Sequence, residues 1–352
     1  MSKNTIPPET DPELAEIWKT HGMPKFFFPR SDKMPETRRL HAQGNVRFMK
    51  SAFAKETLGE QRLWTEEDRP IVLRDGHSVM IRVYRPTAHP GKRPVMLYAH
   101  SGGWCMGGLD TEEFICQLLC MRLGIIIVSV AYRLAPEWPY PTCVLDTYDA
   151  LKWVAGNAKS FGGDLSRGFL TGGVSGGGNL TCMATILARD EHLQPALTGH
   201  LLVCTGMPHS LTDKKGGVLD LFPDQLAHGG WEKYKDGPVA TRAMNDLYAH
   251  LASLSADEPH ATPLTLTDYS GLGPVYYQAA EMDIWRDSAI FYCKKIREAG
   301  GQAKLEIYPG VTHTWWSMFP QLSINKKWAK DLVNGTEWLL KQKRDGSIIP
   351  RL

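Results

Sequence analysis

The residues with the clearest chemical potential form the stretch Gly173-Val174-Ser175-Gly176-Gly177, in which glycines flank a serine. An extended run at 167–171 precedes it, and apolar side chains at helical spacing follow it over 180–188. A serine at such a strand-to-helix turn is typical of a nucleophile elbow, because glycine neighbours permit the tight backbone. The pattern predicts that Ser175 is a catalytic nucleophile, and a plain turn serine is the alternative.

Acyl transfer by a serine also needs a base and an acid that orients the base. His313 lies in a turn-rich segment after the last expected strand, and Asp283 directly follows the expected strand at 275–279. These positions predict a triad of Ser175, Asp283 and His313. The residues alone leave Glu281 and Asp287 as alternatives to Asp283 for the acid. The alternative for His313 is a purely structural role.

The tetrahedral intermediate of acyl transfer needs N–H donors for its negatively charged oxygen. Gly102 and Gly103 follow an expected strand that ends at residue 99, and glycines there let backbone N–H groups approach a substrate oxygen. Gly176 begins the expected helix and would add a third donor. We expect these three glycines to form an oxyanion hole.

Strand-like and helix-like segments alternate through most of the chain. Runs at 71–74 and 79–84 flank the turn Asp75-Gly76, and β-branched residues fill 124–130. This alternation predicts an α/β fold with a mostly parallel sheet covered by helices on both sides. Residues 207–260 interrupt it, so we expect a helical cap insertion there and a catalytic domain over 66–206 and 261–352. Segment 1–65, with helix-like stretches at 13–19 and 38–55, is expected to join the cap.

Four motifs in this order resemble the hormone-sensitive-lipase-like (family IV) carboxylesterases of the α/β-hydrolase superfamily, over roughly residues 70–340. They are His100–Trp104 for H-G-G-G-W, Tyr132–Glu137 for Y-R-L-A-P-E, Gly173–Asn179 for G-D-S-A-G-G-N and Asp283–Asp287 for D-P-L-R-D. The resemblance implies an α/β-hydrolase fold with an eight-stranded sheet, a cap, and a serine mechanism without a cofactor. It favours Asp283 as the acid and implies esters of short to medium acyl chains as substrates.

The chain departs from the family pattern at several positions. Ser101 replaces the first glycine of the oxyanion motif, Val174 and Gly176 replace an acidic residue and an alanine at the elbow, and Trp285 stands in the acid motif. The replacement of Pro-Leu by Ile284 and Trp285 bears on substrate preference and not on the triad. Candidate pocket residues, for which core packing is the alternative, are Trp104, Phe27, Met207 and Trp231.

Composition narrows the class of protein further. The 352 residues carry a formal net charge of +2 without a block of like charges, which argues against a nucleic-acid partner. Lys33, Arg38, Arg39 and Arg47 are interpreted as a solvated helix face. The seven cysteines form no C-x-x-C pair, so neither a zinc nor a redox motif is indicated, and free thiols in a reducing compartment are expected.

The chain has no signal-peptide-like start and no run of eighteen apolar residues, so a cytoplasmic protein without stable membrane insertion is expected. The sequence thus predicts a serine carboxylesterase, with no metal, that acts on a small-molecule ester through an acyl-serine intermediate. An acyltransferase or lactonase with the same triad, or a non-catalytic ligand-binding receptor, is the alternative. Dimers are common in the family, which leaves a homodimer open.

Overall fold

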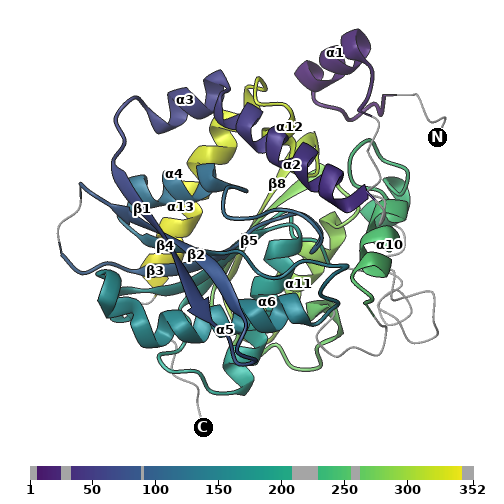
Figure 1. Ribbon diagram of the computed structural model, residues 1–352. Helices are drawn as coiled ribbons and strands as arrows, with labels where there is room; N and C mark the ends of the chain where they lie inside the picture. Colours follow the sequence, from purple (N-terminus) through teal and green to yellow (C-terminus); the bar gives the residue numbers. More distant parts are fainter. Residues whose placement is uncertain (1–5, 25–32, 89–90, 208–228, 255–261, 343–352) are drawn as a thin grey trace.

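The computed structural model describes residues 6–24, 33–88, 91–207, 229–254 and 262–342. Its centre is one sheet (Figure 1). The eight strands of the sheet are β1 (Trp64–Val72), β2 (Ser78–Pro86), β3 (Val95–Ala99), β4 (Ile126–Val130), β5 (Phe169–Val174), β6 (Gly199–Val203), β7 (Val275–Met282) and β8 (Ala303–Thr312).

The strands lie in the order β1-β2-β4-β3-β5-β6-β7-β8. The pairs β1–β2 and β2–β4 are antiparallel, and every other neighbouring pair is parallel. The predicted eight-stranded, mostly parallel sheet is therefore confirmed. The hairpin expected around Asp75-Gly76 joins β1 to β2.

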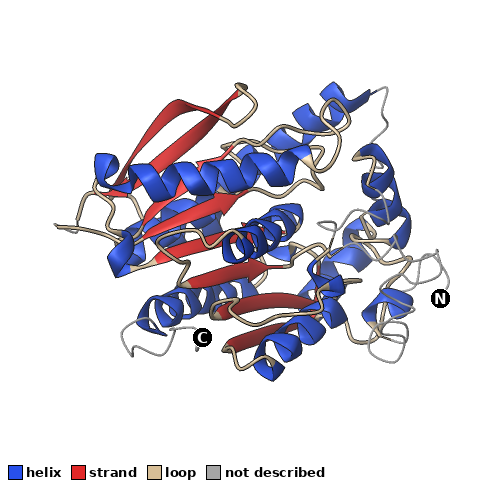
Figure 2. Ribbon diagram, turned by 90° about the horizontal axis from the view of Figure 1, so that it is seen from below, coloured by secondary structure: helices blue, strands red, loops and turns tan. Residues whose placement is uncertain are grey.

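Helices cover both faces of this sheet (Figure 2). They are α1 (Pro12–His21), α2 (Met34–Met49), α3 (Ala52–Leu58), α4 (Glu113–Leu123), α5 (Thr142–Asn157), α6 (Gly176–Asp190), α9 (Gly230–Lys233), α10 (Arg242–Leu251), α11 (Arg286–Glu298), α12 (Trp315–Met318) and α13 (Ile324–Gln342). One face is covered by α4 and α13, which pack together, and the other by α5, α6 and α11. Since both faces are covered, β3, β4, β5 and β6 are buried along their whole length.

The N-terminal helices differ from the sequence expectation at one point. The stretch 38–55 is not one helix, because α2 ends at Met49 and α3 starts at Ala52. Between them Ser51 adopts an extended conformation, and its hydroxyl accepts a hydrogen bond from the Ala54 N–H. A serine N-cap satisfies a donor that would otherwise lack a partner at the start of α3, so the break is stabilised locally.

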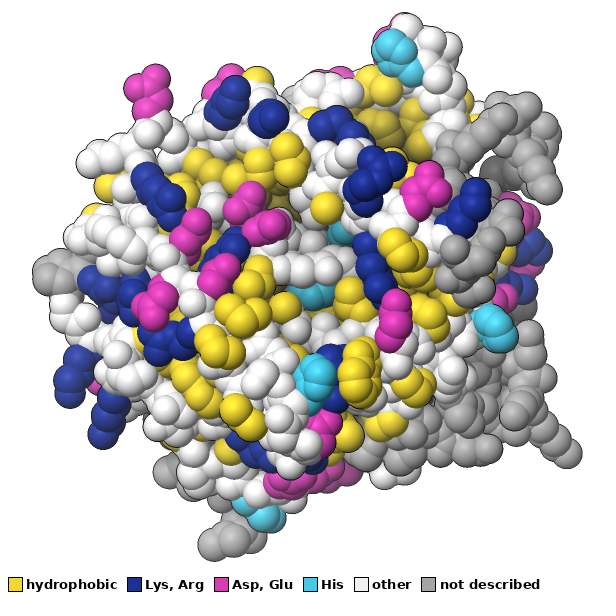
Figure 3. Space-filling model, viewed as in Figure 1, with side chains coloured by type: hydrophobic (Ala, Val, Ile, Leu, Met, Phe, Trp, Pro, Cys, Tyr) yellow, Lys and Arg dark blue, Asp and Glu magenta, His cyan; other side chains and the backbone are white. Residues whose placement is uncertain are grey.

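All seven cysteines are buried free thiols. Across the described part of the chain, no helix combines the length and the apolar character that a membrane crossing requires. On the face shown in Figure 3, basic and acidic side chains are interspersed, without a large area of one sign.

The first turn of α6 lies directly against the end of β3. A Cβ atom added at Gly177 would lie 2.1 Å from the carbonyl oxygen of Ala99 and 2.3 Å from that of His100. Only a glycine permits this approach, because the obstructing atoms are backbone and cannot rotate away. The contact brings the start of α6 beside the loop that follows β3.

We therefore expect Gly177→Ala to lower the free energy of unfolding by about 1–3 kcal/mol, the usual cost of overpacking. The matched control is Gly156→Ala in α5, where an added Cβ meets no atom within 4 Å. Alanine there should raise stability by about 0.5–1 kcal/mol through helix propensity. Denaturant unfolding of both variants measures the difference, and equal stabilities would contradict the argument.

Candidate active site

Ser175 occupies the turn between β5 and α6, with φ 51° and ψ −120°. A residue other than glycine at such a positive φ stores about 1–3 kcal/mol of strain, which surrounding contacts must offset. The Ser175 N–H donates to the Val203 carbonyl at 3.0 Å, and the Gly206 N–H donates to the Ser175 carbonyl at 3.0 Å. The end of β6 and the loop after it therefore hold the serine in this conformation.

The structure brings Ser175, His313 and Asp283 together. Nε2 of His313 lies 2.9 Å from Oγ of Ser175, and Nδ1 of His313 lies 2.6 Å from Oδ2 of Asp283. Because a carboxylate only accepts hydrogen bonds, Nδ1 carries the proton, and Nε2 is left to accept the serine proton. Asp283 follows β7 and His313 follows β8, so the carboxyl ends of neighbouring parallel strands place both groups.

Trp285 orients both partners of the serine. The backbone N–H of Trp285 donates to Oδ1 of Asp283 at 3.1 Å, and the indole ring packs edge-on against the His313 ring at a centroid distance of 5.1 Å. Asp283 and His313 are buried, whereas Ser175 is partly exposed. The arrangement can move a proton from the serine hydroxyl to the imidazole while the carboxylate fixes the tautomer.

The two other candidate acids serve different loops. Glu281 accepts a hydrogen bond from the Gly310 N–H at 2.9 Å. Asp287 accepts from the Gly230 N–H at the start of α9 and pairs with Arg286 at 2.8 Å. Asp283 is therefore the carboxylate that the structure places on the imidazole.

His100 is a structural histidine. Its Nδ1 lies 2.8 Å from the Ser101 carbonyl oxygen, so this nitrogen must be the donor. The ring stacks on Tyr132 at 4.2 Å, and the Tyr132 hydroxyl donates to the His100 carbonyl at 2.9 Å. Burial lowers the pKa of His100 to about 4, against the effect of its hydrogen bond to Ser101, so the ring stays neutral at pH 7.

Backbone contacts fix the directions of the loop N–H groups. The Gly102 carbonyl accepts from the N–H groups of Cys105 and Met106 at 3.1 and 3.0 Å. Because a trans peptide holds its C=O and N–H on opposite sides, the Gly103 N–H points away from this turn. A Cβ added at Gly176 would lie 3.1 Å from the Gly103 nitrogen. The first residue of α6 therefore faces the loop glycine.

Arg38 of α2 reaches the same loop, and its assignment to a solvated face is wrong. Its Nε donates to the Cys105 carbonyl at 2.8 Å, its Nη2 donates to the Ala135 carbonyl at 2.8 Å, and both Nη groups bind the Glu137 carboxylate. Sequence patterns could not indicate this role, because the three partners of Arg38 are distant along the chain. Lys33, Arg39 and Arg47 are exposed as expected.

Three of the four pocket candidates lie among the described residues. Trp104, Met207 and Trp231 are buried, and the Trp104 ring packs edge-on against Tyr140 at 6.3 Å. Phe27 falls outside the described residues. Tyr248 of α10, which sequence reasoning did not single out, lies on Gly103, since an added Cβ there would be 2.7 Å from its ring.

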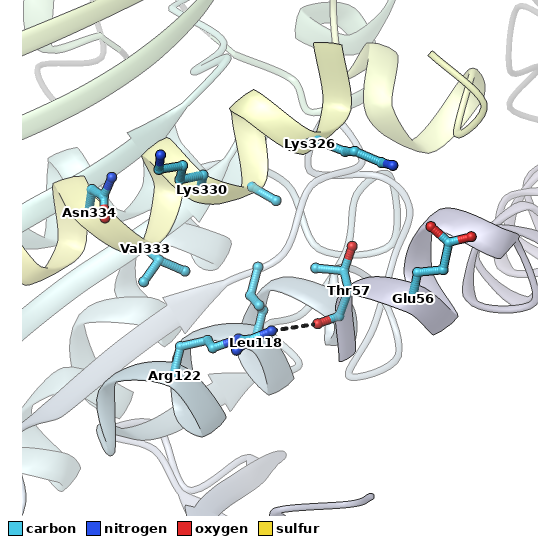
Figure 4. Close-up of a pocket in the computed structure, with 9 residues that line it drawn as sticks. Glu56, Thr57, Leu118, Arg122, Lys326, Lys330, Val333 and Asn334 are labelled. Carbon is cyan, nitrogen blue, oxygen red and sulfur yellow. Dashed lines mark hydrogen bonds between the residues drawn. The ribbon is translucent and has the colours of Figure 1, made fainter. Parts of the chain in front are cut away.

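A groove with a volume of about 410 Å³ lies elsewhere on the molecule, between α3, α4 and α13 (Figure 4). Arg122 crosses it and donates to the Thr57 carbonyl at 3.1 Å, while Lys326 and Lys330 project from α13. None of the groove's lining residues belongs to the triad or to the loop 100–106 after β3, which is the candidate oxyanion loop.

Cys204 lies beside the triad, and its sulfur, a carboxylate oxygen of Asp283 and a ring nitrogen of His313 fall within 4.8 Å of one another. Burial raises the pKa of the Cys204 thiol well above its usual range, so the thiol stays protonated. Both ring nitrogens of His313 are already engaged, one by Ser175 and the other by Asp283. The cluster is therefore better suited to proton transfer than to metal binding.

Comparison with known proteins agrees with this architecture. A sequence profile described as alpha/beta hydrolase fold matches residues 96–317. The chain belongs to the α/β hydrolases, and within them to the hormone-sensitive-lipase-like family.

Individual relatives cover most of the chain. An AB hydrolase superfamily protein of Schizosaccharomyces pombe is 32% identical over 94% of both chains. Carboxylesterase NlhH of Mycobacterium tuberculosis is 33% identical over 73% of this chain and 76% of its own. The solved structure of a vibralactone cyclase has a TM-score of 0.85 at 27% identity and covers 97% of this chain and 98% of its own.

Arg38→Ala tests the contact that closes the oxyanion loop. The change leaves two backbone carbonyls and the Glu137 carboxylate without their donor. We expect the free energy of unfolding to fall by about 1–2 kcal/mol, a modest value because the Arg38–Glu137 pair is partly exposed. Thermal unfolding and ester hydrolysis measure the effect. Arg39→Ala is the matched control, because Arg39 is exposed. If Arg38→Ala and Arg39→Ala unfold at the same temperature and hydrolyse the ester at the same rate, Arg38 does not hold the loop in place.

Proposed function

We propose that the protein is a carboxylesterase in which Ser175 is the nucleophile, His313 the general base and Asp283 the orienting acid. The observation that carries the proposal is the continuous hydrogen-bond path from Ser175 Oγ through both nitrogens of His313 to Asp283. Such a path activates a hydroxyl that is a weak nucleophile at its ordinary pKa.

The reaction follows from the positions of the protons. Oγ of Ser175 attacks the ester carbonyl carbon while Nε2 of His313 takes its proton, and the same nitrogen then protonates the departing alcohol. Water, deprotonated by His313, attacks the acyl-serine. The acid leaves and Ser175 regains its proton.

The negative charge of the tetrahedral intermediate would be held by backbone N–H groups. We assign this role to Gly102, Gly103 and Gly176, because the loop and the first residue of α6 face each other. The start of α6 also directs the positive end of its dipole toward Ser175. Removal of one such donor typically costs on the order of 100-fold or more in rate.

We assign the cap to segments 1–65 and 207–260, above a catalytic domain of 66–206 and 261–352. Among the described residues of these segments, Glu9 accepts hydrogen bonds from Tyr234 and Lys233, each at 2.8 Å. The α9 helix that carries Lys233 starts with the Gly230 N–H bound to Asp287. The two cap segments thus join each other and meet the acid loop.

Short- to medium-chain or natural-product carboxylic esters are the proposed substrates. Similarity to carboxylesterase NlhH supports the ester class. Trp104, Met207, Trp231 and the undescribed Phe27 are the proposed pocket residues, to which the position of Tyr248 on Gly103 adds a further aromatic ring.

A second candidate is attack on the acyl-serine by a hydroxyl rather than by water, or the opening of a lactone. The likeness to vibralactone cyclase favours it. Product analysis by mass spectrometry separates the two, since hydrolysis yields a free acid and acyl transfer yields a new ester or a lactone.

Ser175→Ala removes the nucleophile, so we expect hydrolysis of p-nitrophenyl esters, from acetate to laurate, to fall at least about 1000-fold. Ser78→Ala is the matched control, because Ser78 is exposed on β2. Labelling by an organophosphonate should appear in the wild type and disappear with Ser175→Ala. Full activity of Ser175→Ala would refute the assignment, and a folded wild type that is neither active nor labelled would favour the receptor function.

A further inference from the structure

Ser101 stands at the start of the oxyanion loop and binds Glu112 through two groups. The Ser101 N–H donates to Oε2 of Glu112 at 2.8 Å, and the Ser101 hydroxyl donates to Oε1. Ser101 is buried, and Glu112 is partly buried at the N-cap of α4. Both carboxylate oxygens therefore accept from a single residue, and the two hydrogen bonds join the ends of the segment 101–112.

Glu112 adopts a conformation that a glutamate seldom takes. Its φ is 54° and its ψ is 26°, in the left-handed region that favours glycine. Its side chain makes no N-cap hydrogen bond to its own helix, although N-cap side chains ordinarily do so. The strain and the unused cap are offset by the two bonds to Ser101, which indicates that the orientation of this carboxylate matters to the loop and not to the helix.

We propose that Glu112 is a positioning residue for the oxyanion hole, acting through Ser101. The inference rests on the proposed ester hydrolysis. The two bonds fix the Ser101 backbone and side chain, and the Ser101 carbonyl is held in turn by Nδ1 of His100 at 2.8 Å. That carbonyl belongs to the same peptide group as the Gly102 N–H, so fixing one fixes the direction of the other.

The contact also explains why Ser101 can replace a glycine in this motif. Its N–H is occupied by Glu112 and is unavailable to a substrate oxygen, which leaves the donor role to Gly102 and Gly103. Its hydroxyl would be a buried polar group without a partner if Glu112 were absent, at the usual cost of such groups. Ser101 and Glu112 therefore form one unit.

Burial also changes the titration of Glu112. Burial raises the pKa of Glu112 to about 7, although its bonds from Ser101 and the nearby His313 act in the opposite direction. The other titratable groups that interact with this carboxylate are Tyr98 of β3, Cys116 of α4 and Tyr132. All three have pKa values raised well above their usual range, so they stay neutral.

The test compares Glu112→Ala, Glu112→Gln and Ser101→Ala in the full chain with a p-nitrophenyl ester. Glu112→Ala removes both acceptors, and we expect kcat to fall on the order of 10-fold to 100-fold with KM changed less than about threefold, because donor misplacement acts on the transition state. Ser101→Ala keeps the amide contact and should lose less. Adding Ser101→Ala to Glu112→Ala should have no further effect, because the hydroxyl has already lost its partner.

Glu112→Gln is the conservative variant. Its amide oxygen can still accept from the Ser101 N–H, so we expect most of kcat to return. Because a glutamine does not titrate and the pKa of Glu112 is raised to about 7, the contribution of Glu112 to the acid limb of the wild-type pH–rate profile should be absent from this variant. Glu113→Gln is the matched control; that neighbour in α4 pairs with Gln117 and should leave both kcat and the acid limb unchanged.

Three outcomes would overturn the proposal. They are kcat within twofold of wild type in folded Glu112→Ala, a loss that is additive with Ser101→Ala, and an effect confined to KM. If Glu112→Ala does not fold, the decision rests on kcat of Ser101→Ala and on the pH–rate profile of Glu112→Gln. The proposal would be overturned if both equalled those of the wild type. Failure of the ester-hydrolysis proposal is distinguishable, because Ser175→Ala would then retain wild-type activity.

Discussion

The close approach of α6 to the end of β3 is the constraint on which the candidate site depends. Gly177 lies where any side chain would meet the carbonyl oxygens of Ala99 and His100. That approach sets Gly176 beside Gly103, and it directs the helix N-terminus toward the strained Ser175. The serine, the N–H donors and the sheet therefore share one rigid junction, and strain at the serine is offset by packing around it.

The candidate oxyanion loop is held from several sides because a loop has little order of its own. His100 and Tyr132 stack beneath its start, Arg38 binds the carbonyl of Cys105 at its end, and the Glu112 carboxylate binds Ser101. These contacts come from separate parts of the chain, and each fixes a different peptide plane. Preorganised N–H groups avoid reorganisation as charge develops, which is why an esterase gains from a loop fixed in advance.

The N-terminal segment contacts α9 and the strands that carry Asp283 and His313. The Asp11 N–H donates to the Gly310 carbonyl at 2.9 Å, three residues before His313, and Thr10 contacts the sulfur of Met282, next to Asp283. With Glu9 bound to α9, the segment contacts three parts of the site within a few residues. These contacts link α9 to the two strand ends that place Asp283 and His313.

The sequence by itself determined the class of fold and the position of the candidate nucleophile, Ser175. Alternating strands and helices specify a parallel sheet, and a serine between glycines after a buried strand has few other uses, so local pattern was sufficient. The residues alone left Glu281 and Asp287 as alternatives to Asp283, and the family resemblance favoured Asp283 without showing which carboxylate meets the imidazole. Local pattern also placed Arg38 on a solvated face, and it gave no sign that Glu112 binds Ser101. Those results depend on contacts between residues far apart in the chain, and only the packing of helices and loops around the sheet decided them.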